Sequence, residues 1–319
     1  MATASQLEDL IKAHMNNDNM KFKTIVLKIA AYEARQNHPK LARELSKLVE
    51  KPVQPQSNVV SIGKRNSMLD LSVPNLKLNN LIVSDSIKQK IIRILQEYQN
   101  KNKLRQYGLQ NRKKILIEGP PGTGKTYTAS IIASELRIPL YTVQMDKLVT
   151  KYMGETSVKL RKVFDSIQES RGVYLFDEFD AIGTDRNIDN EVGEMRRVLN
   201  SFLQFIEEYD GNSIIICATN NKDLLDHALF RRFDDVLHYG FPTKKEIKNL
   251  FLARLGAYQT NFVPSSKLGN AAISLSQAEI VRVCNDAMKN SIMIHKQITE
   301  QQLIGLINER QSIYSNKEA

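Results

Sequence analysis

Short apolar runs alternate with stretches of helical periodicity through the middle of the chain. The runs are rich in β-branched residues and predict buried strands at Ile115–Ile117, Leu140–Val143, Val173–Phe176, Ser213–Ala218 and Val236–Tyr239. Between them, apolar residues return every three or four positions, which predicts helices such as 86–106 and 194–208. Strands that alternate with helices favour an α/β fold with three layers, in which a parallel sheet lies in the middle.

The pattern is helical at both ends of the chain and divides the sequence into four segments. Residues 1–50 predict a small helical N-terminal module, and residues 51–75 contain the Pro, Gly and Ser residues typical of a linker. The α/β domain is expected over 76–241, and residues 242–319 predict a C-terminal helical domain.

The composition is that of an ordinary globular protein, with 42% hydrophobic and 25% charged residues. No apolar run approaches the ~18 residues of a membrane span, and the first residues lack a secretion signal. Cys217 and Cys284 both lie in apolar patterns, and the five His residues show no zinc-binding spacing. A cytoplasmic protein without disulfides is therefore expected.

The positive charge is concentrated in the segment that enters the α/β domain. Residues 51–113 hold twelve Lys and Arg against three Asp and Glu, which accounts for most of the net charge of +10. Such a segment suits contact with a nucleic acid or an acidic protein. A solvated linker is the simpler interpretation, and a nucleic-acid partner is possible but not favoured.

A glycine-rich loop follows the first strand and fits the G-x-x-x-x-G-K-[ST] pattern of phosphate-binding loops. Its residues are Gly119, Pro120, Pro121, Gly122, Thr123, Gly124, Lys125 and Thr126. Glycines let backbone N–H groups turn toward a phosphate, and the following helix directs its positive dipole end at the same anion. Lys125 is placed to reach the β- and γ-phosphates and Thr126 to ligate Mg²⁺, whereas the alternative is a Gly/Pro turn without a ligand.

Acidic residues follow the apolar strand at 173–176. Ligands of open α/β sheets bind at the carboxyl ends of the strands, which is where Asp177 and Glu178 are expected. Asp177 would hold the water shell of Mg²⁺, and Glu178 would position or deprotonate the attacking water. The alternative role for this Asp-Glu pair is a helix cap.

Asn220 follows the strand at 213–218 and is expected near the γ-phosphate, where an amide can orient water. The alternative for Asn220 is a residue of an ordinary turn.

Taken in order, these segments resemble the AAA ATPases, within the larger AAA+ group, over about residues 75–312. Gly119–Thr126 looks like the Walker A loop of that family, and Tyr174–Glu178 like Walker B with its catalytic glutamate. Asn220 matches the sensor 1 asparagine. The resemblance implies an ATPase with ATP and Mg²⁺ as cofactors, a P-loop α/β core and a C-terminal helical lid.

Two further segments match motifs that act between subunits or on substrates. Leu225–Asp234 is similar to the family's second region of homology, which implies that Arg232, or its neighbour Arg231, is an arginine finger. The alternative is an ion pair with Asp234 or Asp235.

The segment Lys151, Tyr152 and Met153 with Gly154 resembles pore loop 1, whose aromatic residue grips a polypeptide. Its alternative is a surface aromatic in a mobile loop.

The adenine site is the least specific part of the resemblance. Ile82 and Val83 stand where the family contacts adenine through its backbone. Ser274–Ile280 is similar to the start of the lid helix, but Gln277 replaces the usual Gly.

The leading hypothesis is a ring, a hexamer by resemblance, that remodels or unfolds a protein substrate through a central pore. Residues 1–50 would recruit the substrate or effector. The alternatives are a nucleic-acid-dependent AAA+ switch and an adaptor ATPase that serves a separate protease or effector.

Overall fold

In the computed structural model, the described residues are 8–9, 19–36, 38, 41–44, 67–149, 154–182, 189–220, 230–256, 258 and 262–315. They fall in two compact units, Met1–Arg65 and Asn66–Ala319. The first unit contains α2 (Asn19–Arg35) and a helical segment at 41–44. Val26, Ile29 and Ala30 of α2 are buried, as is Ala42, so the described part of this unit is helical with an apolar face.

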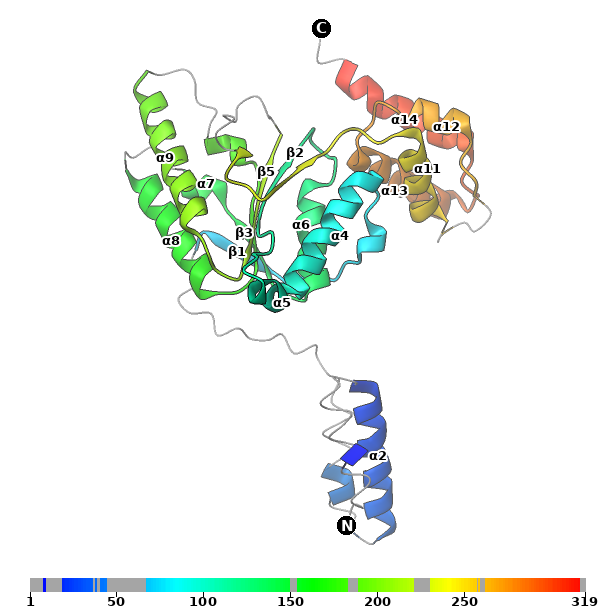
Figure 1. The fold of residues 1–319 in the computed structure, drawn as a ribbon. Helices are drawn as coiled ribbons and strands as arrows, with labels where there is room; N and C mark the ends of the chain where they lie inside the picture. The colour runs from blue at the N-terminus through cyan, green and yellow to red at the C-terminus, as the bar shows by residue number, and fades with distance from the viewer. Residues whose placement is uncertain are drawn as a thin grey trace. The chain divides into compact units, whose positions relative to one another are not determined.

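A six-stranded sheet forms the middle of the second unit (Figure 1). The strands are β1 (Leu69–Ser72), β2 (Lys114–Glu118), β3 (Leu140–Val143), β4 (Val173–Phe176), β5 (Ile214–Thr219) and β6 (Asp235–His238). Their order across the sheet is β1-β3-β4-β5-β2-β6, and the strands from β3 to β6 are parallel. The carboxyl ends of β4, β5 and β2 therefore lie side by side, with β5 in the middle.

β1 corrects two expectations from the sequence. It lies inside the segment 51–75 expected to be a linker, and it pairs antiparallel with β3, so the sheet is not parallel throughout. Its residues are exposed or half-buried, with only the preceding Met68 buried, as suits an edge strand. Such a strand lacks the apolar run that predicts a buried strand.

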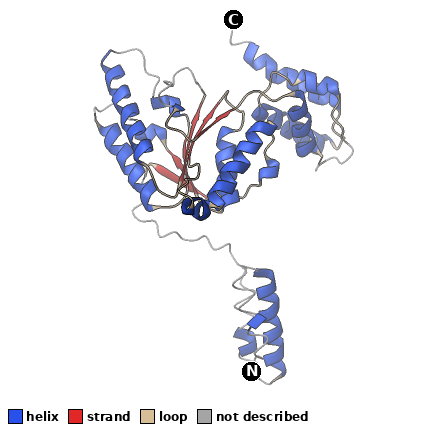
Figure 2. Ribbon diagram, in the orientation of Figure 1, coloured by secondary structure: helices blue, strands red, loops and turns tan. Residues whose placement is uncertain are grey.

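Helices cover both faces of this sheet, as Figure 2 shows. One face carries α4 (Asp85–Gln99) and α6 (Lys125–Leu136), and the other carries α7 (Met145–Leu148), α8 (Glu155–Glu169) and α9 (Asp189–Glu208). The expected helix 86–106 is two helices, because α4 ends at Gln99 and the short α5 (Lys101–Gln106) follows. Short 3-10 turns at Leu78–Asn80 and Phe179–Ile182 complete the domain.

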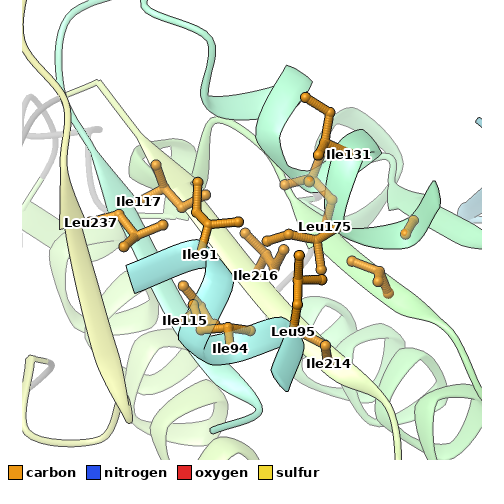
Figure 3. Close-up of a cluster of buried hydrophobic side chains, with 14 of the residues drawn as sticks. Ile91, Ile94, Leu95, Ile115, Ile117, Ile131, Leu175, Ile214, Ile216 and Leu237 are labelled. Atoms are coloured by element: carbon orange, nitrogen blue, oxygen red, sulfur yellow. The ribbon is translucent and has the colours of Figure 1, made fainter. Parts of the chain in front are cut away.

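Branched aliphatic side chains fill the space between the sheet and the α4/α6 layer. Figure 3 shows Ile91, Ile94 and Leu95 of α4 meeting Ile115, Ile117, Ile131, Leu175, Ile214, Ile216 and Leu237. Most of these side chains are fully buried, and each contributes about 1.5–3 kcal/mol by leaving water. This packing fixes the strand ends from which the site residues extend.

The C-terminal part of the second unit is a helical domain with its own core. Its helices are α11 (Lys244–Leu255), α12 (Ser266–Ala271), α13 (Gln277–Ile294) and α14 (Glu300–Ser315). Ile247, Phe251, Leu268, Val283 and Leu303 are fully buried between them. Ile82, which precedes α4, packs against this cluster, so the helical domain contacts the α/β domain near the start of α4.

Candidate nucleotide-binding site

The glycine-rich loop connects β2 to the first residue of α6. Gly119, Gly122 and Gly124 have φ values of 144°, 76° and 100°, which L side chains rarely adopt. A Cβ on Gly119 would lie 2.3 Å from the carbonyl oxygen of Tyr239. Glycine is therefore required there by the backbone of the neighbouring strand end, and the loop directs the N-terminus of α6 at the space above it.

Lys125 is the first residue of α6, and its ammonium is buried among oxygen atoms. Nζ donates to the carbonyl oxygens of Gly119 and Pro120 at 2.7 and 2.9 Å, and to Oδ1 of Asn220 at 2.7 Å. Burial lowers the pKa of Lys125, while the carboxylates of Asp177 and Asp180 oppose that shift. Phosphate oxygens are acceptors of the same kind, so the structure brings Lys125 and Asn220 together where the sequence predicted both.

The two residues expected to hold Mg²⁺ are in direct contact. The hydroxyl of Thr126 donates to Oδ2 of Asp177 at 2.6 Å, and Oδ1 of Asp177 accepts from the backbone N–H of Glu178 at 3.0 Å. A hydroxyl and a carboxylate at this spacing are hard oxygen donors, which Mg²⁺ prefers. The contact joins β4 to the glycine-rich loop, which a mere helix cap would not do.

Glu178 lies just past the end of β4 in an unusual backbone conformation. Its φ of 51° is in the left-handed region, and its side chain lines the same cavity as Lys125 and Thr126. Asn220 directly follows β5, and its backbone N–H donates to Oδ1 of Asp180 at 3.4 Å. The predicted acid, amide, lysine and threonine thus surround one space.

That space is a cavity of about 550 Å³ between the glycine-rich loop and the helical domain. The loop carbonyl of Gly122 accepts from the backbone N–H of Ala278 at 2.9 Å, which fixes the start of α13 on the loop. A Cβ on Gly122 would come within 2.6 Å of Oγ of Ser276, so this close approach also requires glycine.

Of the residues expected at the adenine site, Ile82 lines the cavity, whereas Val83 packs against the buried cluster beneath α4. Gln277, which replaces the family's Gly, also lines it. Sequence reasoning missed several lining residues: Asn80, Leu81, Leu250, Arg254, Val281 and Arg282. They come from separate elements, and no local motif connects them.

Arg231 and Arg232 precede β6 and are not among the residues that line the cavity of their own chain. Arg231 is exposed, and Nε of the half-buried Arg232 lies 3.4 Å from Oε2 of Glu207 on α9. The acids of the alternative interpretation have other partners. Asp234 accepts the backbone N–H groups of Lys113 and Lys114, and Asp235 pairs with Lys90 and Arg112.

The expected pore-loop residues Lys151, Tyr152 and Met153 lie outside the described residues. The next residue, Gly154, has a φ of 82° and precedes the first turn of α8.

A family model and several known proteins match this chain. Residues 115–241 match the family described as "ATPase family associated with various cellular activities (AAA)". An uncharacterized AAA family ATPase, y4kL of Sinorhizobium fredii, is 33% identical over 310 residues, which cover 94% of this chain and 93% of that protein.

Longer relatives match over shorter parts of their length. The ATP-dependent zinc metalloprotease FtsH 2 of a Thermoanaerobacter species is 32% identical over 72% of this chain and 47% of its own length. The peroxisomal ATPase PEX6 of Komagataella pastoris is 30% identical over 69% of this chain and 20% of its own length. The chain therefore spans about half of one of these relatives and a fifth of the other.

A strand, a glycine-rich phosphate loop and a helix, with an acid and an amide at the neighbouring strand ends, define a nucleotide-binding P-loop protein. The chain belongs to the AAA family of ATPases. It therefore hydrolyses ATP, and its family supports ATP-driven remodelling in general. Within the described parts of the chain, no helix combines the length and apolar character needed to cross a membrane.

Proposed function

We propose that the protein assembles into a homo-oligomeric ring, a hexamer by family resemblance, and uses ATP hydrolysis to remodel or unfold a protein substrate through a central pore. The observation that carries the proposal is the arrangement of Lys125, Thr126, Asp177, Glu178 and Asn220 around one cavity. The ring and the pore rest on the family and on the sequence motifs of the finger and the pore loop.

In this proposal the nucleotide lies in the cavity with its phosphates on the glycine-rich loop. Lys125 exchanges the oxygen acceptors it now has for β- and γ-phosphate oxygens, while Asn220 remains beside it. Thr126 and Asp177 would hold Mg²⁺, which neutralises phosphate charge when bound. Glu178 orients a water for attack on the γ-phosphate and accepts its proton.

The finger and the pore loop would act outside the subunit that carries them. Arg232, with Arg231 beside it, would reach the γ-phosphate of the neighbouring subunit and stabilise the charge of the transition state. Lys151, Tyr152 and Met153 would grip the polypeptide in the pore. Residues 1–50 would recruit that protein substrate or effector. The segment before the α/β domain would connect residues 1–50 to that domain.

The test is the ATPase rate as a function of protein concentration, alone, with an unfolded polypeptide, and with DNA. A specific rate that rises with concentration and rises further with polypeptide supports the ring and the pore. A rise with DNA alone would replace this proposal with a nucleic-acid-dependent switch. Normal ATP binding with no response to either would indicate an adaptor that needs its own effector.

A further inference from the structure

A group of cations lies at the edge of the sheet where the strands begin. Lys101 and Arg105 are on α5, which precedes β2, and Arg171 and Asn212 lie shortly before β4 and β5. These three strands are parallel, so this edge is opposite the strand ends that carry the glycine-rich loop, and α5 lies there in Figure 1. None of the four residues lines the nucleotide cavity. We call Lys101, Arg105 and Arg171 the α5 cluster.

The α5 cluster is held by neutral groups. Nη2 of Arg105 donates to Oδ1 of Asn212 at 3.0 Å, and Nζ of Lys101 donates to the same oxygen at 3.5 Å. Nε of Arg171 donates to the hydroxyl of Tyr98 at 2.8 Å. The ring centroid of the buried Tyr98 lies 4.7 Å from Nζ of Lys101 and 5.3 Å from Cζ of Arg171. Within the described part of the chain, no cation of the cluster has a carboxylate as an ion-pair partner.

The like charges of the cluster are close enough to affect one another. Burial lowers the pKa of Lys101, and the positive charges of Arg171 and Arg105 lower it further. This crowding costs free energy, because an amide oxygen and a phenol do not cancel a charge. An anion that bound to the cluster would remove the repulsion and would accept charge-assisted hydrogen bonds.

Other basic residues at this edge already have acidic partners in the chain. Arg112 pairs with Glu97, and Nζ of Lys113 donates to Oδ1 of Asp210 at 2.6 Å. The pKa of Asp210 is lowered by that hydrogen bond and by the charge of Lys113, with a smaller effect from Arg105. The positive charge that the described chain leaves without a directly bonded carboxylate is therefore concentrated in the α5 cluster.

The arrangement of the cluster and its neighbours favours an acidic polypeptide over a nucleic acid. A nucleic-acid strand is bound by cations that follow its successive phosphates, whereas Lys101 and Arg105 converge on a single oxygen atom. One carboxylate matches such a point. Tyr107 and Leu109 follow α5 and are 73% and 57% exposed. Exposed Tyr and Arg side chains are typical of protein interfaces, and the two apolar groups suit apolar side chains of a peptide.

We propose that the α5 cluster, with Tyr107 and Leu109 beside it, is a docking site for an acidic segment of a partner polypeptide. A Glu or Asp carboxylate of that segment accepts from Lys101 and Arg105, and its apolar side chains contact Tyr107 and Leu109. The site is additional to the pore and to residues 1–50, and it does not depend on the proposed function.

The test is fluorescence anisotropy of the full chain with a labelled peptide of alternating Glu and Leu residues. A peptide of Gln and Leu and a labelled oligo(dT) are the comparison probes. The chain should bind the Glu peptide, more weakly at higher salt, and should not bind the Gln peptide. Arg105→Ala and Arg171→Ala should each weaken binding about tenfold, as expected for a lost charge-assisted bond.

Asn212→Asp is the sharpest variant, because it places a carboxylate of the chain where Lys101 and Arg105 converge. It should abolish binding of the Glu peptide and raise the unfolding temperature, since it cancels the repulsion within the cluster. Lys248→Ala is the matched control, because Lys248 is an exposed cation on α11 of the helical domain. It should bind the Glu peptide like the unmodified chain.

Several outcomes would overturn the proposal. One is a chain that does not bind the Glu peptide, and another is normal binding by folded Arg105→Ala and Arg171→Ala variants. A higher unfolding temperature of Asn212→Asp with unchanged peptide binding would show that the cluster has only a structural role. Binding of oligo(dT) in preference to the Glu peptide, lost in the arginine variants, would identify a nucleic-acid surface instead.

Discussion

At the scale of single residues, Glu178 has a strained backbone and lines the nucleotide cavity. Its φ of 51° costs about 1–2 kcal/mol for a residue other than glycine. The hydrogen bond from its N–H to Asp177 helps to hold this conformation, and the turn brings the side chain to the cavity wall. Backbone strain of this kind is concentrated at functional sites, which supports the proposed role of Glu178 in positioning water.

Glu178→Gln tests this role, because glutamine keeps the shape and removes the base. The variant should bind ATP with nearly normal affinity, and its turnover should fall by about 10²- to 10⁴-fold. ATP affinity is measured by titration and turnover by phosphate release under the same conditions. Normal turnover would remove Glu178 from the role of general base, and lost ATP binding would show that the exchange disturbs the site itself.

At the scale of elements, two helices begin with the same cap but in different surroundings. Thr243 at the start of α11 and Ser276 at the start of α13 each form a capping box with the Glu three residues later. Ser276 also lies against Gly122 of the phosphate loop, and the backbone N–H of Ala278 in the first turn donates to the carbonyl oxygen of that glycine. The start of α13 is therefore both a helix cap and a contact with the nucleotide loop.

This difference predicts separate outcomes for Ser276→Ala and Thr243→Ala. Each variant should lose about 1 kcal/mol of stability with its cap, measured by urea unfolding. Only Ser276→Ala should also weaken ATP binding, by about fivefold, because a loosened first turn holds the loop less firmly. If ATP affinity falls equally in both variants, the contact of α13 with the loop has no specific effect.

The elements also show what a sequence can and cannot predict about this site. The loop at 119–126 is one local segment, and Asp177, Glu178 and Asn220 follow buried strands whose carboxyl ends meet at one sheet edge. The local sequence pattern, and the rule that ligands bind at the carboxyl ends of the strands, were enough to predict that these residues lie together. Arg254 and Arg282 lie on two helices without a shared motif, and only the packing of those helices brings them to the cavity.

Long-range packing also explains the other differences between the predictions from the sequence and the structure. β1 is an exposed edge strand without an apolar run, and only its pairing with β3 reveals it. Arg232 pairs with Glu207 of α9, a residue that is distant from it in the sequence. Long-range partners of this kind depend on the fold and not on neighbours in the sequence.

At the scale of the whole molecule, the position of Arg232 bears on assembly. Its guanidinium is half-buried, and its ion pair with Glu207 is solvent-exposed enough to contribute little to stability. In the proposed ring, Arg232 would exchange its ion pair with Glu207 for a contact with the nucleotide of the neighbouring subunit. Hydrolysis would then depend on the presence of an adjacent subunit.

Mixed assemblies test whether this arginine acts between subunits. Arg232→Ala should lose about 10³-fold or more of its turnover while its ATP affinity stays nearly normal, because the arginine acts on the transition state of the next subunit. Lys125→Ala should be inactive because it does not hold the phosphates, although it keeps its arginine. When the two inactive variants are mixed, an intact site of one can meet the arginine of the other, so turnover should partly return.

Arg231→Ala, mixed in the same way, shows which of the two arginines acts. Co-assembly is checked by pull-down of one tagged variant with the other, and co-assembled mixtures that stay inactive would contradict action in trans.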